Sequence, residues 1–200
     1  MNRINRLYLL RHGQVMDFAS FPIYGHTDVD MTETGILQME MAAKRLKLAT
    51  VSAIYASDLK RAHAGALIIA CHHDVPVKVE KDLREMYFGA WEGSTLSHLR
   101  EKYAEELSKR QADPLNYRAP GGAETLSEFS HRIINCMEKI FDANKGGKIV
   151  IVAHGGTNRV ILAQALRMKT EEIFRIHQDY GCLNIIDYFP ESALVRLFNG

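Results

Sequence analysis

Short apolar segments alternate with helical patterns along this chain of 200 residues. Five segments rich in β-branched residues have the length of strands, at residues 7–10, 51–56, 148–153, 183–188 and 193–198. Strands that alternate with helices form βαβ units, so the pattern predicts a largely parallel sheet. The last two segments are joined across Pro190, Glu191 and Ser192, and they predict an antiparallel hairpin at one edge of that sheet.

Apolar residues also recur at the spacing of amphipathic helices. Three such faces are formed by Ile36, Met39, Ala43 and Leu46, by Leu96, Leu99, Tyr103 and Leu107, and by Leu126, Phe129, Ile133, Met137 and Ile140. Thr32 is placed to cap the first helix. Thr125 and Glu128 have the spacing of a capping box, which predicts where the third helix begins.

Residues 86–122 interrupt the alternation, because they combine Gly, Trp and Pro residues with one helical pattern. We expect them to form an insertion over one end of the sheet rather than a separate domain. The predicted architecture is an α/β three-layer sandwich with a mostly parallel central sheet and helices on both faces. A chain of this length makes one ordinary domain, so residues 1–200 are expected to form a single domain.

The charge of the chain is nearly balanced, with 25 Lys and Arg against 24 Asp and Glu. A net charge of +1 argues against binding to nucleic acid or to a membrane surface. Cys71, Cys136 and Cys182 are far apart and odd in number, which argues against a disulfide framework and a zinc site. No apolar run approaches the length of about 18 residues that a membrane span needs. These features predict a soluble, cytoplasmic protein.

Two histidines follow predicted strands and precede glycines. His12 comes after the segment 7–10 and before Gly13, and His154 comes after the segment 148–153 and before Gly155. In open α/β sheets, ligands bind beyond the carboxyl ends of the strands. A single loop histidine is usually a hydrogen-bonded structural residue, but two in equivalent positions favour a functional site.

Two arginines lie near these positions, one at the end of the first predicted strand and one at the start of a predicted helix. Arg11 precedes His12, and Arg61 lies near the start of a predicted helix, where the macrodipole disfavours a cation unless an anion is bound. Arg159 lies farther from the glycines that precede its helix, and a solvated side chain is an equally good interpretation there. Arg11, His12, Arg61 and His154 together predict a phosphate pocket, because guanidinium groups bind phosphoryl oxygens in pairs.

At this point the sequence resembles the histidine phosphatase superfamily over nearly its whole length. The resemblance is carried, in order, by Leu10-Arg11-His12-Gly13, Gly25-His26-Thr27-Asp28, Ser57-Asp58-Leu59-Lys60-Arg61-Ala62, Leu83-Arg84-Glu85, Phe88-Gly89-Ala90-Trp91-Glu92-Gly93, Pro120-Gly121-Gly122-Ala123-Glu124-Thr125 and Val152-Ala153-His154-Gly155-Gly156. Each motif alone is weak, but their order and spacing indicate the family.

The resemblance implies a phosphatase that works through a phosphohistidine on His12. Arg11, Arg61 and His154 would complete the phosphate site, and the insertion would lie over this active site. Glu85 would protonate the leaving group and then take a proton from water. A structural ion pair between Glu85 and Arg84 is the alternative, and Glu92 is the second choice for the proton carrier.

The resemblance also implies what the enzyme binds. Gly13, Gln14, Gly25, His26 and Gly155 would contact the substrate, a small phosphate ester, with α-ribazole 5'-phosphate as one candidate. Neither a metal nor another cofactor is implied, because guanidinium and imidazole groups already neutralise the phosphoryl charge. The protein would be a monomer or a homodimer that binds neither nucleic acid nor membrane.

Two departures from the family pattern leave alternatives open. Many relatives have Glu and Asn where this chain has Gln14 and Phe18, so one phosphate contact is missing or supplied from elsewhere. Phe18, Phe21 and Tyr24 could instead face a bulky leaving group, or simply pack. A cofactor-dependent phosphoglycerate mutase and a phospholigand-binding protein without turnover are the alternative functions.

Overall fold

A mixed sheet lies at the centre of the computed structural model, which describes residues 4–16 and 23–200. Its six strands within these residues are β1 Asn5–Arg11, β2 Ala53–Ala56, β3 Val77–Val79, β4 Lys148–Ala153, β5 Leu183–Phe189 and β6 Ser192–Leu197. Their order is β3-β2-β4-β1-β5-β6. The pairs β2–β3, β2–β4 and β1–β4 are parallel, whereas β5 pairs antiparallel with β1 and β6 with β5. The predicted edge hairpin is confirmed.

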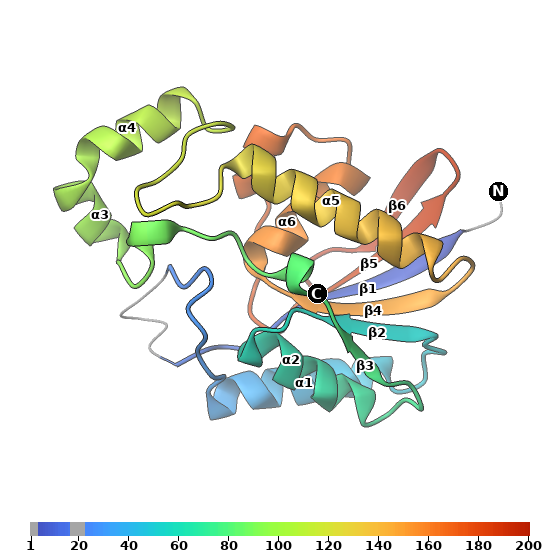
Figure 1. Ribbon diagram of the computed structural model, residues 1–200. Coiled ribbons are helices and arrows are strands. Elements are labelled where there is room, and N and C mark those ends of the chain that lie inside the picture. Colours follow the sequence, from blue (N-terminus) through green and yellow to red (C-terminus); the bar gives the residue numbers. More distant parts are fainter. Residues whose placement is uncertain (1–3, 17–22) are drawn as a thin grey trace.

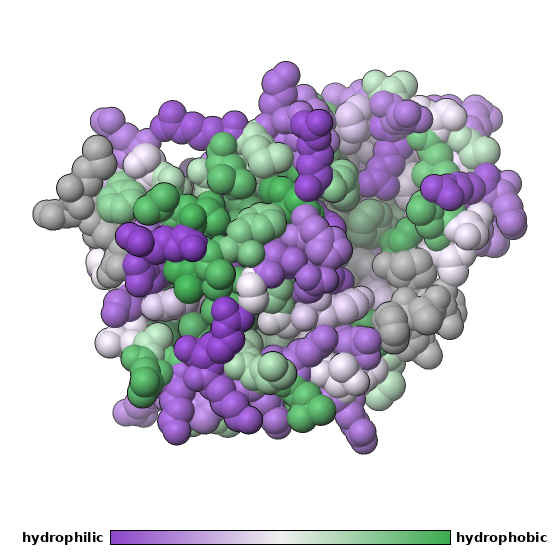
Figure 2. All heavy atoms as spheres, turned by 180° about the vertical axis from the view of Figure 1, so that it is seen from behind, coloured by the Kyte–Doolittle hydropathy of each residue, from purple (hydrophilic) through white to green (hydrophobic). Residues whose placement is uncertain are grey.

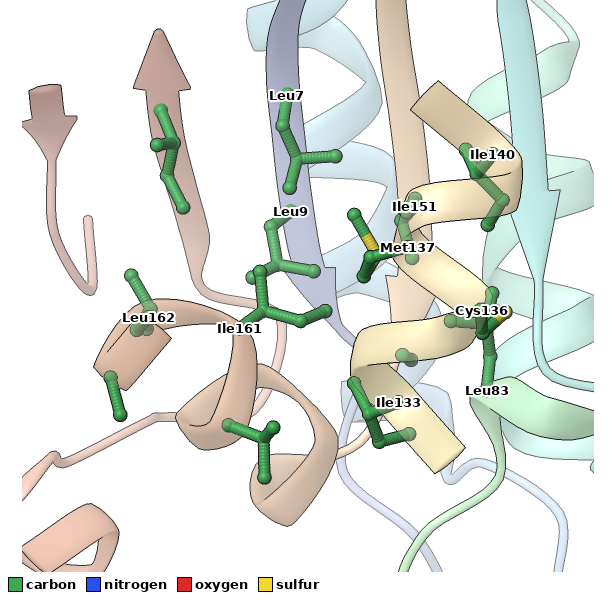
Figure 3. Close-up of a cluster of buried hydrophobic side chains, with 14 of the residues drawn as sticks. Leu7, Leu9, Leu83, Ile133, Cys136, Met137, Ile140, Ile151, Ile161 and Leu162 are labelled. Carbon is green, nitrogen blue, oxygen red and sulfur yellow. The ribbon is translucent and has the colours of Figure 1, made fainter. Parts of the chain in front are cut away.

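Helices cover both faces of the sheet, as predicted (Figure 1). Helices α1 (Glu33–Leu46) and α2 (Lys60–Ala70) lie on one face, and α5 (Leu126–Asp142) and α6 (Gly155–Ala165) lie on the other. A separate apolar core fills each interface. Figure 3 shows the second core, in which Leu7 and Leu9 of β1 face Met137 of α5 and Ile161 of α6. The three-layer α/β sandwich is therefore confirmed.

Local capping fixes where two of these helices begin. The Thr32 side chain accepts a hydrogen bond from Gly35 N, and the Thr125–Glu128 capping box is complete. The predicted apolar face of α1 is wrong at Ile36, which is 40% exposed. Gly35 is buried there instead, against the backbone of Gln14 just after β1, where any side chain would collide.

The segment 86–122 contains two helices where the sequence predicts one. Helix α3 (Leu96–Lys102) ends at Tyr103, whose φ of −126° is not helical, and α4 (Ala104–Ala112) follows directly. Leu99 is buried there with Trp91, Ala119 and Ala123 in a small core of their own. In Figure 1, α3 and α4 lie beside the main body of the sheet and helices. Leu96, predicted on the apolar face, is the first residue of α3 and is exposed.

Short elements complete the chain. Three 3₁₀ turns, η1 (Lys81–Leu83), η2 (Gly89–Trp91) and η3 (Thr170–Arg175), and strand β3 do not follow from the sequence pattern. β3 is only three residues long and largely exposed. A strand this short shows no recognisable alternation of apolar and polar residues.

The surface carries scattered apolar residues. Figure 2 shows the face opposite to Figure 1, where a group of hydrophobic residues lies among hydrophilic ones. Leu194 and Phe198 are among the exposed large apolar side chains of the chain, and such exposure is ordinary for a soluble surface. Over the described residues, no helix has both the length and the apolar character needed to cross a bilayer.

Candidate active site

His12 directly follows β1 and is held as a neutral ring. Its backbone N–H donates to Ala153 O at 3.0 Å, and its side chain is 4% exposed with Nδ1 2.8 Å from Gly13 O. Because a carbonyl oxygen only accepts hydrogen bonds, Nδ1 carries the proton and Nε2 keeps its lone pair. Burial, reinforced by the Arg61 and Arg11 cations, lowers the pKa of His12 well below 6.5. The ring is therefore uncharged at neutral pH and keeps a lone pair on Nε2.

His154 lies against His12, with their ring centroids 5.1 Å apart. It is the N-cap residue of α6 and is fully buried. Within the part of the chain that the structure describes, neither of its ring nitrogens has a hydrogen-bond partner. Burial and the Arg61 cation lower the pKa of His154 well below 6.5. A buried imidazole without partners is costly, so this ring is suited to a bound group that supplies them.

Arg61 is a buried cation in the first turn of α2, with 1% of its surface exposed. Its guanidinium donates to Thr27 O and Gly25 O, both at 2.8 Å, and its Nε is buried without a partner among the described residues. Burial lowers the pKa of Arg61 from its ordinary value, which shows how poorly the charge is solvated. The sequence-based expectation of a cation at this helix start is confirmed.

Arg11, the last residue of β1, is fixed by the loop that precedes β5. Its Nη1 donates to Gln178 O at 2.6 Å, and its guanidinium carbon lies 3.8 Å from the centre of the Tyr180 ring. Gln178 is itself held by Asn184 on β5, in a buried network of amide side chains. The Nε of Arg11 is buried without a partner in the described residues. The orientation of this guanidinium thus depends on β5 as well as on its own strand.

Glu85 does not pair with its neighbour Arg84. The Arg84 guanidinium forms two hydrogen bonds of 2.6 Å with Asp58 instead. The Glu85 carboxylate accepts hydrogen bonds from Met86 N at 2.9 Å and from Gly156 N at 2.8 Å. A side chain at Gly156 would lie 2.1 Å from Glu85 Oε1, so glycine is required at that position. The Arg84 ion-pair alternative is therefore wrong.

His12, Arg11, Arg61 and Glu85 open onto one cavity of about 270 Å³. His154 packs against His12 but does not itself line the cavity. The cavity is lined by Arg11, His12, Ile23, Tyr24, Gly25, Arg61, Glu85, Phe88, Gly155, Arg159 and Tyr180. Among these described residues, three arginines face one carboxylate, which leaves two excess positive charges when the histidine is neutral. A phosphate monoester dianion would balance that charge, and guanidinium groups suit its oxygens.

Gly13 and Gln14, both predicted to contact substrate, do not line the cavity. A side chain at Gly13 would lie 2.1 Å from Gly35 O, so this glycine allows β1 and α1 to approach closely. The Gln14 side chain accepts a hydrogen bond from Thr32 Oγ1 at 3.0 Å, at the cap of α1. The geometry gives both residues structural roles, while Gly25 and Gly155 do lie in the cavity wall.

His26 and Glu92 form the support behind Glu85. His26 Nε2 lies 2.9 Å from Glu85 O, and its ring packs on Tyr87. The Glu92 carboxylate accepts from the backbone N–H groups of His26 and Thr27. Neither His26 nor Glu92 lines the cavity, so the predicted contact of His26 with substrate has no support from this geometry.

Tyr24 lines the cavity, and its hydroxyl donates to Met16 O at 2.7 Å. Phe18 and Phe21, the other aromatic residues expected near a leaving group, lie outside the described residues. The position where many relatives have Asn and this chain has Phe18 is therefore also outside the described residues.

The sequence left a solvated side chain as an equally good interpretation of Arg159, and it did not identify Tyr180 or Gly156 as site residues. Arg159 Nε donates to Ile176 O at 2.7 Å, which turns the guanidinium into the cavity wall, and burial lowers its pKa. It is on the same face of α6 as Gly155, four residues earlier, and that helical spacing was the available signal. Tyr180 lies in a loop without periodicity, so no pattern in the sequence identifies it.

The two buried histidines predict an acid-sensitive fold. Their folded pKa values lie below 6.5, so the unfolded chain takes up protons first as the pH falls, and stability is lost below pH 6.5. Each histidine should contribute about 1.4 kcal/mol per pH unit between its folded and unfolded pKa values. Urea unfolding at pH 7.5, 6.5 and 5.5 measures the slope of the free energy of unfolding against pH. His154→Gln should make this slope shallower, while burial also lowers the pKa values of His26 and His73, which keep part of the slope. An unchanged slope would show that His154 is not buried as a neutral ring.

A family model described as "Histidine phosphatase superfamily (branch 1)" matches residues 7–200. The adenosylcobalamin/alpha-ribazole phosphatase of Escherichia coli (strain K12) is 26% identical over 97% of this chain and 95% of its own length. A metal-independent phosphoserine phosphatase of Arabidopsis thaliana is 33% identical over 80% of this chain and 68% of its own length. The crystal structure of the alpha-ribazole phosphatase from Shigella flexneri has a TM-score of 0.87 and 27% identity, and covers 98% of this chain and 96% of that one.

Proposed function

The chain belongs to the histidine phosphatase superfamily and is a phosphoric monoester hydrolase, and we propose that it uses His12 as the nucleophile. The single observation that supports this assignment best is the hydrogen bond from His12 Nδ1 to Gly13 O. It leaves the Nε2 lone pair of a neutral ring available for attack on phosphorus. Arg11 and Arg61 would hold the phosphoryl oxygens, and the unpartnered ring of His154 would donate to one of them.

The reaction would proceed in two transfers. In the first, Nε2 of His12 forms a bond to phosphorus while the bond from phosphorus to the ester oxygen breaks, and Glu85 gives a proton to that oxygen. In the second, Glu85 takes a proton from water, the water oxygen bonds to phosphorus, and the bond from phosphorus to Nε2 breaks. Glu85 suits both steps, because its carboxylate is fixed by two backbone N–H groups at the edge of the cavity.

The cavity supports a small organic leaving group. Ile23, Tyr24 and Phe88 give its wall an apolar part, opposite in character to the arginines. The relatives named above act on α-ribazole phosphate and on phosphoserine, and we include α-ribazole 5'-phosphate among the substrates proposed here. Arg159 would add a third cation to the anion site. Gln14 would act through the cap of α1 at Thr32, and His26 through the backbone carbonyl of Glu85.

We also propose a domain organisation, an oligomeric state and a cellular location for the enzyme. Residues 1–200 would form a single histidine phosphatase domain, with residues 86–122 as an insertion over the active site. The protein would be a cytoplasmic monomer or homodimer that acts on a small molecule and binds no nucleic acid. The small net charge of +1 supports this proposal.

A panel of phosphate monoesters tests the function, with release of inorganic phosphate as the measurement. The panel contains α-ribazole 5'-phosphate, phosphoserine, 3-phosphoglycerate and p-nitrophenyl phosphate, each with and without 2,3-bisphosphoglycerate. We expect hydrolysis that does not require the bisphosphate. Transfer to 2-phosphoglycerate without phosphate release would identify a mutase, and no turnover of any ester would contradict the proposal.

Chelation should not affect the activity. The cations that face the cavity are guanidinium groups, and the described residues contain no group of three His, Cys, Asp or Glu side chains that could hold a metal ion. Treatment with EDTA should therefore change kcat/KM less than about twofold, since no metal-activated water is needed. A loss of activity that added magnesium restores would contradict this expectation.

A further inference from the structure

Arg110 of α4 is a largely desolvated cation surrounded by aromatic rings. Its guanidinium carbon lies 5.5 Å from the ring centre of Phe174, 5.6 Å from that of Trp91 and 6.0 Å from that of Phe88. Within residues 4–16 and 23–200, no carboxylate or carbonyl group forms a hydrogen bond or ion pair with it. Burial lowers the pKa of Arg110 from its ordinary value. Within these residues, its charge therefore faces the aromatic rings rather than an anionic partner.

The three rings come from two parts of the chain. Phe88 and Trp91 lie at the start of the insertion, shortly after Glu85, and Phe174 belongs to η3, which follows α6. Helix α4 itself has no fully buried residue. Arg110 is thus a contact through which the exposed helix α4 reaches the body of the enzyme.

Phe88 connects this cluster to the active site. Phe88 lines the catalytic cavity. It also lines a second, small cavity, whose wall includes Arg110 and Trp91. Any displacement of the Phe88 ring would change the apolar part of the wall, where Ile23 and Tyr24 also lie. Arg11 and Arg61, which would hold the phosphoryl oxygens, donate to the carbonyl oxygens of Gln178, Gly25 and Thr27. Glu92 accepts from the backbone N–H groups of both Thr27 and Phe88, so the Phe88 backbone stays tied to this loop and only its ring is expected to shift.

We propose that Arg110 is a positioning residue that holds the Phe88 ring against the cavity and thereby sets the affinity of the enzyme for bulky apolar leaving groups. The inference rests on the proposed function, because it needs the leaving group to lie beside Phe88. Arginine suits this position better than lysine, since a broad, weakly hydrated guanidinium can lie within cation–π range of several rings, whereas an ammonium is a compact, strongly hydrated charge.

The test compares the KM values of two esters, 1-naphthyl phosphate and methyl phosphate, in Arg110→Met, Arg110→Lys and the parent. Lys109→Met is the matched control, because Lys109 is on the same helix but pairs with Glu105 and Glu106 on its exposed side. Arg110→Met should raise the KM for 1-naphthyl phosphate about tenfold, the effect of losing cation–π contacts to a ring that must stay in place. The KM for methyl phosphate should change less than about twofold, because the phosphate contacts are intact.

Trp91 gives a second measurement, because it is the only tryptophan of the chain and is 1% exposed. Its fluorescence should be protected from acrylamide in the parent and in Lys109→Met, and more easily quenched in Arg110→Met. Arg110→Lys keeps the charge and should lie between the parent and Arg110→Met in both measurements.

The outcomes distinguish a failure of the proposed role of Arg110 from a failure of the proposed phosphatase function. Equal KM changes for both esters, or none for either, would overturn the role of Arg110 even if the parent is fully active. Unchanged protection of Trp91 in Arg110→Met would overturn it as well. A parent enzyme that hydrolyses neither ester would instead overturn the proposed function on which the inference rests.

Discussion

Glu85→Gln should slow phosphoryl transfer from alkyl phosphates by about 10²–10⁴-fold, the usual contribution of a positioned general acid. An alkoxide is a strongly basic leaving group, so its departure from phosphorus requires a proton. p-Nitrophenolate is weakly basic and leaves without one, so transfer from p-nitrophenyl phosphate should slow far less. The glutamine amide has nearly the size of the carboxyl group but cannot act as an acid.

The measurement is the single-turnover burst with each ester, because steady-state rates also contain the hydrolysis of the phosphoenzyme, where Glu85 would act as the base. Glu92→Gln is the matched control, since the Glu92 carboxylate supports the backbone of His26 and Thr27 but does not line the cavity. Its effect should not depend on the leaving group. Equal slowing of both bursts by Glu85→Gln would show that Glu85 is not the leaving-group acid.

The positions of His12 and His154 could be predicted because they follow from periodicity. Each histidine comes directly after a buried apolar run, and parallel pairing of β1 with β4 brings the ends of those runs together. The cap at Thr32 and the capping box at Thr125 are equally local, and both are confirmed. The fold class, and the end of the sheet at which the two histidines lie, could therefore be predicted without tertiary information.

The orientation of individual side chains could not be predicted in the same way. Arg84 pairs with Asp58 rather than with its neighbour Glu85, because the turn before the helix of Arg61 brings that carboxylate closer. Gln14 turns to Thr32 at the cap of α1 rather than to the cavity. These choices depend on which partner lies within hydrogen-bond distance after folding, and the sequence alone does not contain that distance.

Tyr180 and Arg110 show the same limit at the rim of the site. Tyr180 stacks on Arg11 across more than a hundred residues of sequence, and Arg110 reaches Phe88 from a helix with no buried residue. Neither residue belongs to a motif or to an apolar face. Residues of this kind are found only from the contacts of the folded chain.

The covalent intermediate is the central claim, and it has the largest expected effect on activity. If His12 is the nucleophile, His12→Ala removes the atom that bonds to phosphorus, and turnover should fall by about 10⁴-fold or more. The loss cannot be explained by the phosphate contacts, because Arg11 and Arg61 are held by Gln178, Gly25 and Thr27 and remain in place. The variant should therefore still bind inorganic phosphate.

Trapping the phosphoenzyme tests this claim most directly. The enzyme is mixed briefly with substrate, quenched without acid because a phosphohistidine is acid-labile, digested and analysed by mass spectrometry. One phosphoryl group on His12 in the parent, and none in His12→Ala, is the predicted result. Phosphate on another residue of the parent, or a burst of the same size in His12→Ala, would contradict it.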